Sequence, residues 1–181
     1  AGQHARAGKV KLSVQRRNGK FTRLRVELLC YDSYGWKLKE SHLYVGLNSP
    51  RKMAPGRFPF KQEGNSLTSA HQYYVDLDTL GNEFENVYIA VHAVMEKVSE
   101  GNYNDGFAIG SEETAWGFKT ASGYYPEMGK GQTVNYEGNP WGTIFPKRNK
   151  RWPAYFMVNI PYSKNISFVD CPKPFHLIYV L

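Results

Sequence analysis

One ten-residue stretch of this 181-residue chain, Asn86 to Met95, is apolar on both faces if its backbone is extended. One face then carries Val87, Ile89, Val91, Ala93 and Met95, and the other carries Tyr88, Ala90, His92 and Val94. The β-branched and aromatic residues, and the Gly-rich segment that follows, favour a strand over a buried helix. Because both faces are apolar, the stretch is predicted to be the central strand of a sheet covered on both sides.

The N-terminal segment predicts a β-hairpin with a cationic outer face. Apolar and polar residues alternate from Lys9 to Gln15, and the alternation resumes from Phe21 to Tyr31. Between the two segments, Asn18-Gly19 is a strong signal for a tight hairpin turn. The inward positions are apolar, whereas the outward positions of the second segment include Arg23 and Arg25.

Further alternating segments separated by turn signals predict about nine to twelve short strands in all. Prolines mark a loop over residues 50–61, and residues 101–142 combine glycines with aromatic residues in long loops. No repeat or linker divides the chain. We expect a flexible arm at residues 1–7, followed by one all-β domain at residues 8–181. Its predicted architecture is an antiparallel β-sandwich of the jelly-roll-like or Ig-like kind.

The composition indicates a basic, secreted protein. The net charge of +7 and the pI of about 9.3 favour anionic partners. A disulfide between Cys30 and Cys171 would join the early and late segments in an oxidising compartment, and two unrelated buried thiols are the alternative. Asn165-Ile166-Ser167 is a glycosylation acceptor. The chain starts at Ala1, without a leader or an apolar run of membrane-spanning length, so we expect a mature or trimmed extracellular chain.

The chemistry-bearing residues do not assemble a catalytic or metal-binding motif. Glu112 and Glu113 would point to opposite faces of an extended chain, so they cannot act as an acid–base pair. We expect them to pin a loop by accepting backbone N–H groups, and a metal site shared with Asp105 is the alternative. The histidines lack metal-ligand spacing, and His92 is interpreted as a hydrogen-bonded core residue. The sequence predicts a protein that is not an enzyme and needs no metal or cofactor.

Two kinds of side chain are candidates for contact with partners. Cations suited to sulfate, phosphate or carboxylate groups are Arg16, Arg17, Arg23, Arg25, Lys147, Arg148, Lys150 and Arg151. Aromatic candidates for docking a protein or stacking on a sugar are Trp116, Tyr124, Tyr125, Trp141 and Trp152, which could equally belong to the core. The run from Lys147 to Arg151 could instead be a solvated loop tip that blocks edge-to-edge pairing. Nucleic acid is not an expected partner, because the chain lacks a recognisable reader motif.

Three motifs resemble a known kind of module. His42–Gly46 (HLYVG), Ile89–Val94 (IAVHAV) and Glu113–Gly117 (ETAWG), in this order, resemble a secreted β-rich module of extracellular proteins from bacteria and some invertebrates. This resemblance covers about residues 36–160, and it implies an extracellular location and a β fold without a catalytic signature. By composition, the chain is also similar to glassin-like proteins, which accompany silicatein in the axial filaments of siliceous sponge spicules. That similarity implies a structural role beside silicatein, with the cations facing silica.

We therefore expect a non-catalytic, secreted structural or interaction protein of an extracellular or biomineral assembly. Aromatic loops would dock partner proteins, and basic segments would bind an anionic polymer or silica. The alternative is a carbohydrate-binding module that uses exposed Trp and Tyr side chains. A glycan-acting enzyme is the third hypothesis, and it would need two carboxylates roughly 5–10 Å apart in a cleft. The candidates for such a pair are Asp105, Glu112, Glu113, Glu127 and Glu137.

Overall fold

The computed structural model describes residues 7–17, 20–51, 54–102, 105–117, 142–144, 154–163 and 176–180. The strands in these ranges are β1 (Gly8–Arg17), β2 (Lys20–Cys30), β3 (Trp36–Gly46), β4 (Phe60–Thr68), β5 (Ala70–Asp76), β6 (Glu83–Lys97), β7 (Glu112–Trp116), β8 (Gly142–Ile144), β9 (Ala154–Ser163) and β10 (His176–Val180). Short 3-10 helices occur at η1 (Asp32–Tyr34), η2 (Pro55–Arg57) and η3 (Leu77–Thr79). No helix in this part of the chain is long and apolar enough to cross a membrane.

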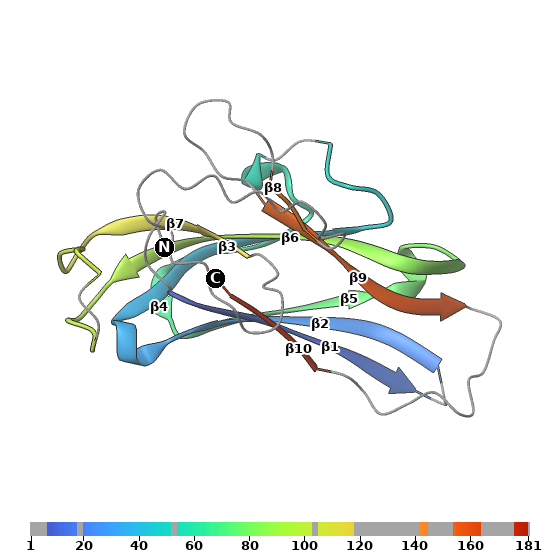
Figure 1. The fold of residues 1–181 in the computed structure, drawn as a ribbon, viewed down its shortest axis with the longest axis horizontal. Coiled ribbons are helices and arrows are strands. Elements are labelled where there is room, and N and C mark those ends of the chain that lie inside the picture. Colours follow the sequence, from blue (N-terminus) through green and yellow to red (C-terminus); the bar gives the residue numbers. More distant parts are fainter. Residues whose placement is uncertain are drawn as a thin grey trace.

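The described strands form two antiparallel sheets that pack against each other as two layers (Figure 1). The four-stranded sheet has the order β10-β1-β2-β5. The six-stranded sheet has the order β4-β3-β6-β9-β8, and β7 also pairs with β6. Inward side chains of both sheets, including Val10 and Leu24 from one and Trp36 and Phe156 from the other, belong to a single core cluster. The predicted all-β sandwich is confirmed.

Strand β6 is the central strand that the sequence predicts. It pairs with β3 on one side, and with β9 and β7 on the other. The fully buried residues on its core face are Val87, Ile89, Val91, Ala93 and Met95. On the opposite face, Ala90 and His92 are also buried. Both faces of the strand are covered, which explains why its apolar run is almost continuous.

The predicted N-terminal hairpin is also confirmed. Strands β1 and β2 pair from Gly8 opposite Cys30 to Arg17 opposite Lys20, with one register shift after Gln15. Residues 1–6 of the predicted arm lie outside the described residues. Ala7 is buried, and its carbonyl accepts a hydrogen bond from the Tyr31 N–H at 2.9 Å, so the core begins at that residue.

Strand β4 departs from the sequence prediction, which placed a loop as far as residue 61 and no strand directly after it. Most side chains of β4 are exposed, because it is an edge strand that pairs with β3 but packs little of its surface on the core. It therefore lacks the apolar alternation that reveals a strand. Only Ser69 separates β4 from β5, yet the two strands belong to different sheets, so the chain crosses between the layers there.

Candidate functional site

A row of cations crosses the outer face of the four-stranded sheet. This cationic stripe consists of Lys9 and Lys11 of β1, followed by Arg25 and Arg23 of β2. The register places Arg25 opposite Ser13, one two-residue step beyond Lys11. It places Arg23 opposite Gln15, one further step along the same axis. Each step is about 6.7 Å long, so the four cations span roughly 20 Å.

The stripe faces outward because the residues between its members fill the core. The alternate positions of β1 and β2 that are buried are Val10, Leu12, Val14, Leu24, Val26 and Leu28. In a pleated strand the neighbours of buried residues must point to the opposite face. Arg23 is accordingly exposed, and Lys9, Lys11 and Arg25 are partly exposed. The core pattern of the hairpin thus sets the positions of the cations.

Tyr74 of β5 lies beside the stripe and is 47% exposed. It is paired opposite Arg25. The guanidinium carbons of Arg23 and Arg25 lie 5.8 and 5.9 Å from the centre of the Tyr74 ring. These distances are typical of cation–π contacts, which restrain the guanidinium groups without using up their N–H donors. The result is an exposed aromatic ring with two Arg guanidinium groups within about 6 Å of its centre.

Two carboxylates pair with the stripe. Asp76 Oδ1 accepts a hydrogen bond from Arg23 Nε at 2.8 Å, and both side chains are exposed. Glu27 Oε1 accepts one from Arg25 Nη2 at 2.7 Å, and its Oε2 lies 3.9 Å from Lys11 Nζ. Glu27 is only 6% exposed, and in the described part of the chain its Oε2 and Arg25 Nε have no hydrogen-bond partner. The four cations of the stripe and these two carboxylates together carry a net charge of +2.

The sequence predicts only part of this surface. Arg23 and Arg25 lie on the outer face as expected, and Arg16 and Arg17 belong to β1 near the hairpin turn, with side chains that are not described. Lys9 and Lys11 were not among the predicted contact residues, although the alternation of β1 places them on the same face. The predicted contact and glycosylation residues outside the described ranges are Lys147, Arg148, Lys150, Arg151 and Asn165.

Trp116 is a predicted contact residue that the structure describes, and it is half-buried. Its ring meets His92 edge-on at 4.9 Å and Phe58 edge-on at 6.2 Å. Phe58 and His92 are both buried, so Trp116 packs against the outer face of the six-stranded sheet. The other predicted aromatic contacts, Tyr124, Tyr125, Trp141 and Trp152, lie outside the described residues.

The two adjacent glutamates of β7 point to opposite faces, as predicted from an extended chain. The register with β6 pairs Glu112 and Glu113 with successive residues of that strand. Glu112 is about half exposed and forms an ion pair with Lys39. The hydrogen bond described for Glu112 therefore goes to a lysine side chain rather than to the backbone N–H groups that we expected it to hold.

Asp105 is the carboxylate that ties the Gly-rich segment to the core. It accepts hydrogen bonds from Lys97 Nζ at 2.8 Å, from Trp36 Nε1 at 2.9 Å and from the Phe107 N–H at 3.2 Å. Lys97 is 1% exposed and also donates to the Tyr34 carbonyl at 2.8 Å. Desolvation alone raises the pKa of Asp105, but these hydrogen bonds and the Lys97 charge outweigh it and lower the pKa. The sequence signal for this role was weak, because Asp105 is one polar residue among many in its segment.

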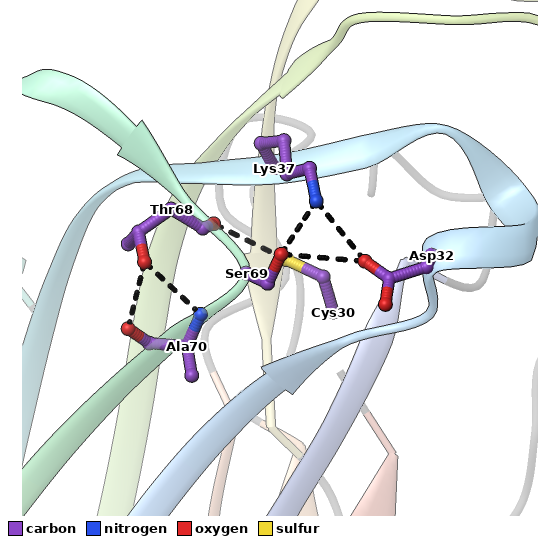
Figure 2. Close-up of polar contacts among 6 residues, drawn as sticks. All are labelled: Cys30, Asp32, Lys37, Thr68, Ser69 and Ala70. Carbon is purple, nitrogen blue, oxygen red and sulfur yellow. Dashed lines mark hydrogen bonds and ion pairs between the residues drawn. The ribbon is translucent and has the colours of Figure 1, made fainter.

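Cys30, the last residue of β2, and Lys37, near the start of β3, both lie near Ser69, which connects β4 to β5 (Figure 2). Burial raises the pKa of the Cys30 thiol to about 11, so the thiol is protonated at neutral pH and is a poor nucleophile. Within the described residues Cys30 has no disulfide partner. Its predicted partner, Cys171, lies outside the described residues, and the disulfide stays a prediction.

Lys37 and Ser69 are the two residue types of a catalytic Ser–Lys pair, but Lys37 also forms an ion pair with Asp32. Lys37 Nζ donates to Ser69 Oγ at 2.5 Å and to Asp32 Oδ1 at 3.0 Å (Figure 2). The hydrogen bond from Lys37 lowers the pKa of Asp32. An ammonium group that is engaged with a carboxylate in this way has no lone pair with which to activate the Ser69 hydroxyl.

Comparisons with protein-family models, with curated proteins and with solved structures find no match to this chain. The resemblance of three motifs to an extracellular module therefore stays a prediction, as does the similarity to glassin-like proteins. The functional hypothesis therefore rests on the cationic stripe and not on similarity to known proteins.

Proposed function

We propose that this protein is a non-catalytic binding module that holds a linear anionic polymer along the cationic stripe. The observation that carries the proposal is the row of four cations at successive two-residue steps, over roughly 20 Å of the sheet. A polymer whose negative charges repeat along its length can meet several members of such a row at once. Sulfated or carboxylated polysaccharides have this character.

The side chains of the stripe suit such a ligand. Arg23 and Arg25 can offer two N–H donors to one sulfate or carboxylate, whereas Lys11 supplies a point charge. Glu27 and Tyr74 already hold Arg25 in place, which reduces the entropy lost when a ligand orders the side chain.

Asp76 forms an ion pair with Arg23, and the side chains of both residues are exposed. Exposed pairs of this kind contribute little free energy, about 0–1 kcal/mol. An anionic polymer can therefore displace the Asp76 carboxylate from Arg23 at small cost. The ion pair would orient the guanidinium group and then release it to the ligand.

Secretion and a role in an assembly belong to the same proposal. They are supported by the net charge of +7, by the glycosylation acceptor at Asn165 and by the motif resemblance to an extracellular module. In a mineralised matrix, silica would be the inorganic counterpart of the polymer, because its surface carries silanolate anions. Protein partners, silicatein among them, would dock elsewhere on the aromatic loops.

The proposal is tested by replacing Lys9, Lys11, Arg23 and Arg25 together with Gln, which lowers the net charge from +7 to +3. Affinity for heparin, used as a sulfated probe, is measured by calorimetry at about 0.15 M salt. We expect a loss of more than about 100-fold, because each charge-assisted hydrogen bond contributes more than about 1 kcal/mol. The same variants on silica beads show whether the stripe also binds the mineral.

A matched control removes four cations from elsewhere on the molecule, and it also lowers the net charge to +3. The residues replaced with Gln are Lys37, Lys39, Arg57 and Lys61. This control should keep the affinity for heparin within about threefold. An equal loss in both variants would mean that net charge alone drives binding. A loss only when the run Lys147–Arg151 is replaced with Ser would move the contact there and overturn the proposal.

A further inference from the structure

Two buried histidines face each other on the outer side of the six-stranded sheet. His42 of β3 and His92 of β6 are directly opposite partners in the register, and they are 5% and 7% exposed. Their Nδ1 atoms lie 3.4 Å apart. The ring centres are 5.5 Å apart and the planes are tilted by 46°, so the rings are not stacked. The two strands are neighbours within the sheet, which fixes the backbone on both sides of the pair.

The separation of the two Nδ1 atoms distinguishes between a hydrogen bond and a shared ligand. Hydrogen bonds donated by N–H groups in proteins are about 2.7–3.2 Å long, so 3.4 Å is long for a direct bond. Zinc binds imidazole nitrogen at about 2.0–2.1 Å with tetrahedral geometry, which places two nitrogens of one ion about 3.3–3.4 Å apart. The spacing of the pair therefore fits two ligands of one metal ion.

The contacts of the two imidazole rings are suited to this role. Glu63 Oε1 lies 3.1 Å from His42 Nε2, so the carboxylate accepts a hydrogen bond from Nε2. With Nε2 held by Glu63, Nδ1 is the His42 nitrogen that faces His92, as in carboxylate–histidine–metal arrangements. His92 Nδ1 faces His42 Nδ1 across 3.4 Å, so it is placed to be the second ligand.

We propose that His42 and His92 bind one divalent first-row transition-metal ion through their Nδ1 atoms, with Glu63 orienting His42. Imidazole donors suit Zn²⁺ or Cu²⁺, whereas Mg²⁺ and Ca²⁺ prefer oxygen. No group of three or more His, Cys, Asp or Glu within the described ranges is placed to hold a metal, so the described residues supply two protein ligands to this site. The Glu63 side chain, which contacts the Nε2 side of His42, is 55% exposed. The site is independent of the cationic stripe, which lies on the other sheet.

The test is titration of the EDTA-treated, dialysed protein with Zn²⁺ at pH 7.5, followed by calorimetry and by the unfolding temperature. We expect one Zn²⁺ per chain at saturation and a rise in unfolding temperature that Mg²⁺ does not reproduce, because a ligand that binds only the folded state stabilises it. Binding should be lost in His92→Gln. Glu63→Gln, which alters an exposed side chain, should weaken Zn²⁺ binding about 10–100-fold.

His71→Gln is the matched control, because His71 is also partly buried but bonds Ser41 Oγ at 2.6 Å, away from the pair. This variant should bind Zn²⁺ as the parent protein does. If His92→Gln does not fold, the Zn²⁺ affinity of Glu63→Gln still tests the proposal. The proposal is overturned if the parent protein binds no Zn²⁺, or if neither His92→Gln nor Glu63→Gln changes the affinity.

Discussion

On the four-stranded sheet the outward side chains of Arg23 and Tyr74 are exposed, whereas on the six-stranded sheet the outward side chains of His42 and His92 are buried. Both outer faces arise from the same strand alternation, but on the second the buried Phe58 contacts Trp116, which in turn contacts His92 edge-on. A polar side chain on the first face interacts mainly with water and neighbouring charges. On the second face it must find a partner inside the protein.

This difference separates residues that can bind a ligand at little cost from residues on which folding depends. Removing an exposed cation changes what the molecule binds and leaves its stability almost unchanged. Removing a buried polar group leaves its partner unsatisfied, which costs far more. The comparison therefore predicts that removing an exposed cation such as Arg23 alters binding, whereas removing a buried polar group on either face lowers stability.

The largest effect is expected from Lys97→Met in the six-stranded sheet. The change leaves the Asp105 carboxylate buried without its ion-pair partner, which should lower the free energy of unfolding by about 3–5 kcal/mol. Urea denaturation followed by circular dichroism measures it. Lys37→Met removes a Lys–Asp pair of similar length that is exposed, and it should leave the midpoint unchanged. Equal effects of the two substitutions would contradict the expected difference between buried and exposed ion pairs.

The second-largest effect is expected from acid, which should lower the stability of the protein through the buried His92. His92 has a pKa of about 4 in the folded protein, against about 6.5 when unfolded, so only the unfolded chain takes up a proton between these values. Stability is full above pH 6.5 and falls as the pH is lowered toward 4, by up to about 3 kcal/mol.

The measurement is urea denaturation from pH 7.5 to 4.5 with EDTA present. His92→Gln should show a shallower decline than the parent protein. Some decline should remain in that variant, because burial also lowers the pKa of His71. An identical slope in both proteins would show that His92 is not the group responsible.

The smallest change in stability should follow from Arg23→Gln on the exposed face. Its ion pair with Asp76 and its contact with Tyr74 are both open to solvent, so the free energy of unfolding should fall by less than about 1 kcal/mol. A loss above about 2 kcal/mol, measured by the same urea titration, would mean that this face also supports the fold. The stripe would then be a structural feature as much as a binding one.

The fold was largely predictable from the sequence because its core strands carry strong patterns. The run of β6, which is apolar on both faces, predicts a central strand, and the alternation around Asn18-Gly19 predicts a hairpin. Strand β4 was not predictable, since an exposed edge strand need not alternate. The bulge between Leu38 and Glu40 was missed as well, because it inserts a residue into β3 without interrupting the strand.

The candidate sites were less predictable, because they depend on distances between strands. Alternation alone places Lys11 and Arg25 on one face, but only the register shows that they belong to a single row. His42 and His92 are 50 residues apart in sequence, so no spacing rule could pair them. The buried contact of Asp105 with Lys97 likewise follows from how the segment after β6 folds back.

The most direct test of the central claim is to map which lysines the polymer protects. Acetylation rates of individual lysines are measured by mass spectrometry with and without heparin at about 0.15 M salt. We predict that Lys9 and Lys11 become protected, whereas Lys39 and Lys61 on the other sheet react at unchanged rates. Protection confined to Lys147 and Lys150, with Lys9 and Lys11 unaffected, would contradict the account.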